Sequence, residues 1–143
     1  MAHSMVQRNI GCEAAAAVAQ AAVAAAREQG ARINVAVVDR AGLLCAFLRM
    51  PDAPLHSIDI AIDKAYTAAS FGLATSRWTE VLAEHSAAVR QGLVQRPRFV
   101  AFGGGLPIVD NGELTGAVGV SGGSEAQDEE IAKAGLAAIG MNK

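Results

Sequence analysis

Hydrophobic periodicity divides the N-terminal third of the chain into a helix and two strands. Alanine and valine dominate residues 12–28 without an internal glycine or proline, which predicts a helix that Gly30 ends. Two β-branched or aliphatic runs follow at residues 32–39 and 43–48, and the short turn between them contains Gly42. These two runs predict an antiparallel hairpin.

Two more helices are predicted in the middle of the chain. Residues 56–71 carry apolar side chains every three or four positions, and Gly72 ends this helix. The side chains expected to face the core are Ile58, Ile62, Ala65, Tyr66 and Ala69. A further helix should begin near Thr75 or Ser76 and end near Gly92.

The C-terminal part predicts strands, tight turns and a last helix. Strands are expected at residues 99–102, 106–109 and 114–120. Asn111 and Gly112 form the strongest turn signal of the chain, between the last two strands. Ser124 and Gln127 have the spacing of a capping box, which predicts a helix from there to about Ile139.

This order of elements favours one α/β domain of the α+β kind. Strands joined by tight turns pair antiparallel, so we expect an antiparallel sheet flanked by helices. A chain of 143 residues is the size of one domain, which we place at residues 9–143. Residues 1–8 have the character of a tag remnant and N-terminal arm, so His3 is left out of site reasoning.

Composition argues against several classes of partner. The net charge is −2, and no two Lys or Arg residues are adjacent, so nucleic acid is not expected as a partner. No apolar stretch reaches the roughly 20 residues of a membrane span, so no membrane partner is expected either. Cys12 and Cys45 lack CxxC spacing, which favours reduced thiols at or near the core of a cytoplasmic protein.

Two glycine-containing segments are candidates for ligand contact. Gly105 ends a run of three glycines that lets a ligand approach the backbone or simply forms a turn. Ser121 and Gly122 precede the last helix, whose first N–H groups could hold a carboxylate or a phosphate. Ser124 can satisfy those donors itself, and the acidic residues that follow it would repel an anion.

Three polar residues of the helix at residues 56–71 could carry chemistry. His56 is a candidate metal or haem ligand, although a histidine at a helix end is more often a surface or capping residue. Asp59 belongs to a solvated face or assists a cation or proton transfer. Lys64 either extends to water or enters a pocket to bind an anion, and the sequence leaves both open.

Four segments together resemble the GlcG/HbpS-like family, which includes the C-terminal domain of PduO-type proteins. They occur in the family's order at residues 37–43, 57–69, 104–107 and 116–122. The resemblance implies a profilin-like, three-layer fold with a five-stranded antiparallel sheet, assembled into dimers or larger homo-oligomers. Members of the family are reported to bind haem, and others are associated with corrinoid metabolism or glycolate utilisation.

The resemblance also implies which residues line a shared pocket. The ligand-binding positions that we predict are His56, Asp59, Lys64, Gly105, Ser121 and Gly122. The first hypothesis is a cytoplasmic homo-oligomer that binds haem or another tetrapyrrole, with His56 meeting the metal. The alternative is a catabolic enzyme, an isomerase, tautomerase or lyase, that uses Asp59, His56 or Lys64 for proton transfer on a small organic acid. A third hypothesis is a scaffold subunit with a vestigial pocket.

Overall fold

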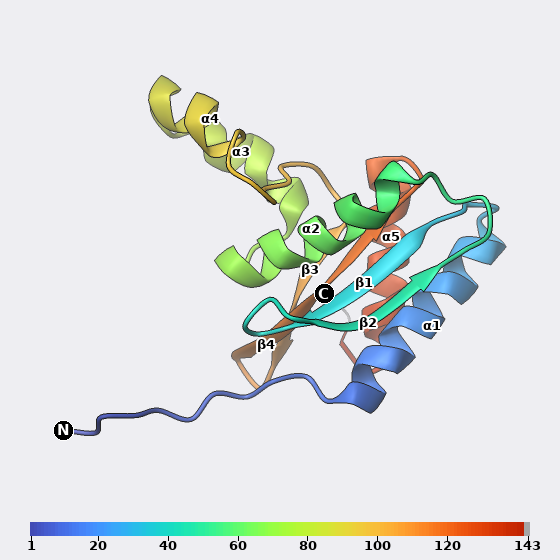
Figure 1. Ribbon diagram of the computed structural model, residues 1–143, viewed down its shortest axis with the longest axis horizontal. Coiled ribbons are helices and arrows are strands. Elements are labelled where there is room, and N and C mark those ends of the chain that lie inside the picture. The colour runs from blue at the N-terminus through green and yellow to red at the C-terminus, as the bar shows by residue number, and fades with distance from the viewer. Residues whose placement is uncertain (142–143) are drawn as a thin grey trace.

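A four-stranded antiparallel sheet lies between helices on both of its faces (Figure 1). The computed structural model describes residues 1–141. Its elements are α1 (Cys12–Glu28), β1 (Asn34–Asp39), β2 (Leu44–Arg49), α2 (His56–Phe71), the 3-10 turn η1 (Thr75–Arg77), α3 (Trp78–Ala83), α4 (Ala87–Leu93), β3 (Gly105–Asp110), β4 (Glu113–Ser121) and α5 (Glu125–Ala137). This arrangement confirms the α+β class.

The strand order β2-β1-β4-β3 places the two most buried strands, β1 and β4, at the centre of the sheet. β1 pairs antiparallel with both β2 and β4, and β3 pairs only with β4. Alternate side chains of β1 enter different cores because successive residues of a strand face opposite sides. Val35 and Val37 pack with α1 and α5, whereas Ala36 and Val38 pack with α2.

The predictions for α1 and the start of α5 are confirmed. α1 spans the predicted residues, and its buried face is almost entirely alanine. Small side chains let α1 come close to α5, where a methyl group at Gly135 would lie 2.9 Å from the carbonyl oxygen of Val18. Ser124 and Gln127 form the predicted capping box at the start of α5.

Helix α2 has the predicted bounds, but of the five side chains expected to face the core only Ala65 and Ala69 are buried. Ile58, Ile62 and Tyr66 are only half-buried. The face against the sheet consists of small residues and one lysine, with Ala61, Lys64, Ala65 and Ala68 among its members. Small residues allow the helix backbone to approach β4 closely, which larger isoleucine side chains would prevent.

The predicted strand at residues 99–102 is wrong, and the sheet has four strands rather than five. The backbone of this segment bonds to α2 instead of to a strand. The N–H of Val100 donates to Oγ1 of Thr67 at 3.1 Å, and the Thr67 hydroxyl donates to the carbonyl oxygen of Arg98 at 2.9 Å. One threonine of the helix therefore takes the place of a strand neighbour.

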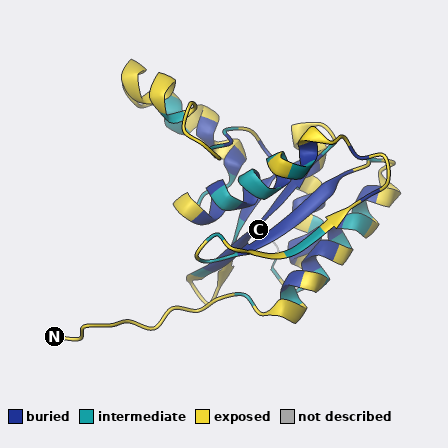
Figure 2. Cartoon of the chain, in the orientation of Figure 1, coloured by how far each residue is buried: buried dark blue, intermediate teal, exposed yellow. Residues whose placement is uncertain are grey.

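The single helix predicted from Thr75 or Ser76 to Gly92 is wrong as well, since it is divided into η1, α3 and α4. The break comes at Ser86, whose extended backbone caps α4 and whose Oγ accepts from the N–H of Val89 at 3.3 Å. Figure 1 shows α3 and α4 projecting from the body, and Figure 2 shows that the surface of this projection is largely exposed.

The expectation that the cysteines lie in or near the core is also wrong. Both Cys12 and Cys45 are exposed free thiols. Cys12 is the first residue of α1, outside its buried face. Cys45 lies where the register between β1 and β2 shifts, in an edge strand whose ends are open to solvent.

The close approach of α2 to β4 makes a testable prediction at Gly119. A Cβ there would lie 2.1 Å from the carbonyl oxygen of Ala61 and 2.5 Å from the amide nitrogen of Ala65. Because backbone atoms cannot move aside cheaply, we expect Gly119→Ala to lower the free energy of unfolding by about 2–3 kcal/mol in urea titrations. Gly11→Ala, at a position with open space, is the control. Equal stability of the two variants would contradict the packing described.

Candidate functional site

A buried lysine joins α2, β4 and α5 at one point. The side chain of Lys64 is 1% exposed. Its Nζ donates to the carbonyl oxygen of Val120 at 2.8 Å and to Oδ2 of Asp128 at 3.1 Å. The ring of Phe102 lies 5.1 Å from the same nitrogen, within the range of a cation–π contact. Of the two alternatives left open for Lys64, the structure shows the inward one.

Asp128 is the anionic partner of this lysine, and it was not among the predicted site residues. Its side chain is 3% exposed, and its second oxygen, Oδ1, accepts from the N–H of Gly123 at 2.9 Å. The carboxylate therefore holds both the lysine and the loop that enters α5. A signal was present in the sequence, because Asp128 has the helical spacing of the buried residues Ile131 and Ala132.

The electrostatics of the pair follow from its burial. Removal from water lowers the pKa of the Lys64 amine from its usual 10.5, and the Asp128 carboxylate opposes that shift. The two acceptors and the aromatic ring compensate an ammonium group that would otherwise be costly to bury. The geometry is that of a structural ion pair.

Three consecutive glycines, the last of which begins β3, allow the backbone to pass close to this pair. A Cβ at Gly104, where φ is +128°, would lie 2.6 Å from Nζ of Lys64. A Cβ at Gly105 would lie 2.6 Å from the Lys64 carbonyl oxygen. The N–H of Gly105 is already used, since it donates to Oγ1 of Thr75 at 2.9 Å. The structure thus gives Gly105 a packing role, and its contact with a ligand stays a prediction.

Ser121 and Gly122 lie at the end of β4, next to the same junction. Ser121 is buried and pairs with Asn34 of β1 across the sheet. Gly122 has φ +140°, and a Cβ there would lie 2.3 Å from the carbonyl oxygen of Arg32. The structure therefore brings Lys64, Gly105, Ser121 and Gly122 into one region, and the shared pocket that the resemblance implied for them stays a prediction.

The other two predicted residues lie apart from this region. His56 and Asp59 are exposed, in the first turn of α2. His56 precedes Lys64 by eight residues of α2, which corresponds to about 12 Å along the helix axis. Two partly buried hydrogen bonds hold the loop before His56. Nδ2 of Asn34 donates to the carbonyl oxygen of Pro54 at 3.4 Å, and Nη2 of Arg49 donates to the carbonyl oxygen of Ala53 at 2.8 Å.

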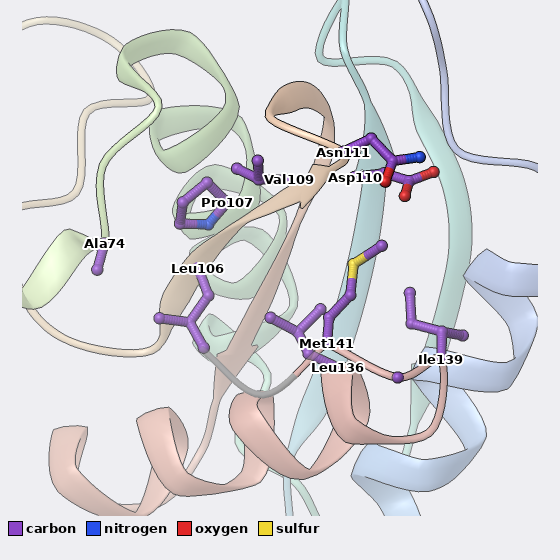
Figure 3. A pocket seen from close by; sticks show the side chains of 10 residues that line it. Ala74, Leu106, Pro107, Val109, Asp110, Asn111, Leu136, Ile139 and Met141 are labelled. Carbon is purple, nitrogen blue, oxygen red and sulfur yellow. The ribbon is translucent and has the colours of Figure 1, made fainter.

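An apolar cavity, which the sequence did not reveal, lies between the edge strand β3 and the C-terminal end of α5. Its volume is about 440 Å³. Leu106 and Pro107 of β3 face Leu136 and Met141 across it, and Asp110 lies at its rim (Figure 3). None of the six predicted ligand-binding residues lines this cavity.

Residues 1–141 contain neither a cluster of metal-binding side chains nor a helix that could cross a membrane. No group of three or more His, Cys, Asp or Glu side chains in this part of the chain could hold a bare metal ion. No helix among these residues has the length and apolarity needed to cross a membrane.

Comparison with known proteins identifies the family. The family described as "Haem degrading protein HbpS-like" matches residues 10–137. The chain belongs to the HbpS-like family. An uncharacterised 15.0 kDa protein of the dhaT-dhaS intergenic region of Citrobacter freundii is 40% identical over 123 residues, which cover 86% of this chain and 87% of that protein. The resemblance noted in the sequence is thus confirmed.

Solved structures of relatives have the same fold over almost the whole chain. The crystal structure of Klebsiella pneumoniae protein ORFY has a TM-score of 0.90 at 34% identity, and the match covers 100% of this chain and 99% of that one. The structure named "PduOC:Heme Complex" has a TM-score of 0.84 at 33% identity and covers 92% of this chain and 96% of that one.

The buried pair predicts a characteristic pattern of stabilities. Asp128→Ala leaves the Lys64 ammonium buried and unpaired, so we expect it to lower the free energy of unfolding by about 3–5 kcal/mol. The double variant Lys64→Met/Asp128→Leu should be more stable than Asp128→Ala because it buries no charge. Lys133→Met removes the exposed contact with Glu130 and serves as control, with an expected change below about 1 kcal/mol. Urea unfolding measures all three, and a small effect of Asp128→Ala would refute the structural role of the pair.

The lowered pKa of Lys64 predicts a dependence of stability on pH. Between its pKa in the folded protein and the unfolded value of 10.5, the unfolded chain binds more protons at this group. The contribution of Lys64 to the free energy of unfolding therefore rises with pH in this window. We expect the difference in stability between wild type and Lys64→Met/Asp128→Leu to shift in favour of wild type as pH increases there. A shift in the opposite direction would show that the pKa is raised.

Proposed function

We propose that this protein binds haem or a closely related tetrapyrrole, with the imidazole of His56 as the ligand to the iron. The observation that carries the proposal is membership of the HbpS-like family together with the 33% identity to PduOC, whose structure is named as a haem complex. Haem is therefore the cofactor that we favour for this chain.

The residues around His56 fit such a ligand. The iron of haem already has four porphyrin nitrogens, so a single exposed imidazole suffices to hold it on one side. Leu55, directly before His56, is 73% exposed and offers apolar surface to a porphyrin face. Asp59 lies three residues further on, where its carboxylate would accept from the second imidazole nitrogen and orient the ring.

Arg49, next to the loop before His56, supplies positive charge for a propionate group, whereas Arg32 is already paired with Asp52. Nη1 of Arg32 lies 3.2 Å from Oδ2 of Asp52, and Nη2 of Arg49 donates to the carbonyl oxygen of Ala53. Guanidinium groups suit carboxylates because they can donate two parallel hydrogen bonds. When bound, haem would supply redox and ligand-binding chemistry at its iron, while the chain's own residues hold and orient it.

Self-association and a cytoplasmic location belong to the same proposal. Exposed leucines on and beside the edge strand β2 support a homo-oligomer, since a second copy of the chain would cover them. They are Leu43, Leu44 and Leu48. The low cysteine content supports the cytoplasm.

No observation at His56, Asp59 or Lys64 favours the alternative of proton transfer on an organic acid.

A titration with haemin tests the proposal. We expect a saturable, shifted Soret band in the wild type, and an affinity about tenfold lower with an altered band in His56→Ala, because the iron loses its protein ligand. His85→Ala is the matched control, since His85 lies on the projection between α3 and α4. Absence of a saturable band in the wild type would contradict haem binding, and an unchanged band in His56→Ala would contradict the ligand.

A further inference from the structure

Aromatic side chains gather at the base of the projection formed by α3 and α4. Four of the six in the chain meet there: Tyr66, Phe71, Trp78 and Phe99. Trp78 contacts the rings of Phe71 and Phe99 edge to face, with centroid distances of 4.7 and 4.8 Å. Because only 4% of the chain is aromatic, this concentration distinguishes the base of the projection from the rest of the molecule.

A small cavity opens among these rings, between α2 and the segment that returns from α4. Its volume is about 190 Å³. Tyr66, Phe71 and Phe99 provide aromatic walls, Leu93 and Pro97 provide aliphatic ones, and the side chains of two arginines also line it. A cavity of this size is smaller than the usual site of a drug-sized ligand, so it suits a group of about one ring.

The first arginine, Arg98, is held rigidly. Its φ is +68°, a conformation that L-residues other than asparagine and aspartate rarely adopt. Nε donates to Oδ1 of Asp63 at 2.9 Å, and the guanidinium carbon lies 3.6 Å from the centroid of the Tyr66 ring. Strained residues held by several contacts cluster at binding sites. Arg98 shapes one wall while Asp63 neutralises its charge.

The second arginine, Arg96, supplies charge that nothing in the described part of the chain neutralises. Arg96 lines the cavity, and it takes part in none of the ion pairs found within residues 1–141. An uncompensated guanidinium beside an apolar, aromatic cavity matches a ligand with a carboxylate on an apolar body.

We propose that this cavity binds a small organic acid made of one carboxylate and one ring-sized apolar group. The ring would occupy the space between Phe99 and the edge of Tyr66, because Arg98 covers one face of the Tyr66 ring, and the carboxylate would pair with Arg96. The site is separate from the proposed haem site, because Tyr66 follows His56 by ten residues of α2, or about 15 Å along the helix axis.

Titration with 3-phenylpropionate, followed by amide and side-chain NMR, tests the proposal. We expect saturable binding that perturbs the signals of Tyr66 and Phe99, with an affinity about tenfold lower in Arg96→Gln, because a charged hydrogen bond is lost. Arg27→Gln makes the same change of charge in the last turn of α1 and should bind like wild type. The uncharged analogue 3-phenylpropanol should bind about tenfold more weakly than the acid.

Two results would overturn the proposal: no saturable binding of the acid, or equal affinities for wild type and Arg96→Gln. Arg96 is exposed, so its substitution should leave the thermal midpoint unchanged, and circular dichroism checks this. Repeating the titration with saturating haemin tests whether the two sites are separate. Unchanged binding supports a free acid at a separate site, whereas displacement would contradict that separation. Because the main titration contains no haemin, its result is independent of the proposed haem binding.

Discussion

The buried contact of Lys64 with Asp128 and with the carbonyl oxygen of Val120 determines how α2, β4 and α5 come together. An ammonium group that is 1% exposed requires acceptors within bonding distance, so the three elements can sit only where those acceptors converge. The glycines around the pair follow from this constraint. Side chains at Gly104 or Gly119 would collide with Lys64 itself or with the backbone of α2.

This arrangement places the packing face of α2 opposite the residues of the two proposed sites. The inner face of α2 fixes the helix to the sheet through small side chains and Lys64. Its outer side carries His56 and Asp59 at the first turn and Tyr66 further on. A rigidly packed helix holds such side chains in place more precisely than a loop would, which is what a ligand site needs. The two sites proposed above lie at opposite ends of this helix.

The sequence predicted correctly those helices whose beginnings and ends are determined by neighbouring residues. The alanine run, Gly72 and the capping box of Ser124 and Gln127 correctly gave the helices α1, α2 and the start of α5. The strand expected at residues 99–102 failed because its apolar pattern cannot show that Thr67, more than thirty positions earlier, takes its hydrogen bonds. Pairing over such a distance is a property of tertiary structure.

The candidate site was predictable only in part for the same reason. The resemblance named Lys64 and Ser121, and the structure brings them into one region. Asp128 was missed because its neighbours in the sequence are also acidic, and it was grouped with them as residues that would repel an anion. Its helical spacing with Ile131 and Ala132 indicates a buried position, but the lysine that stabilises it there lies 64 positions away, beyond any local pattern.

We infer that Lys64 supports the fold, and we propose that His56 meets the ligand. The haemin affinity of the double variant Lys64→Met/Asp128→Leu, measured on protein shown to be folded, tests this division of roles. We expect an affinity within about twofold of wild type, because distant sites contribute independently. Loss of haemin binding in this folded variant would contradict the division and identify Lys64 as a ligand-binding residue.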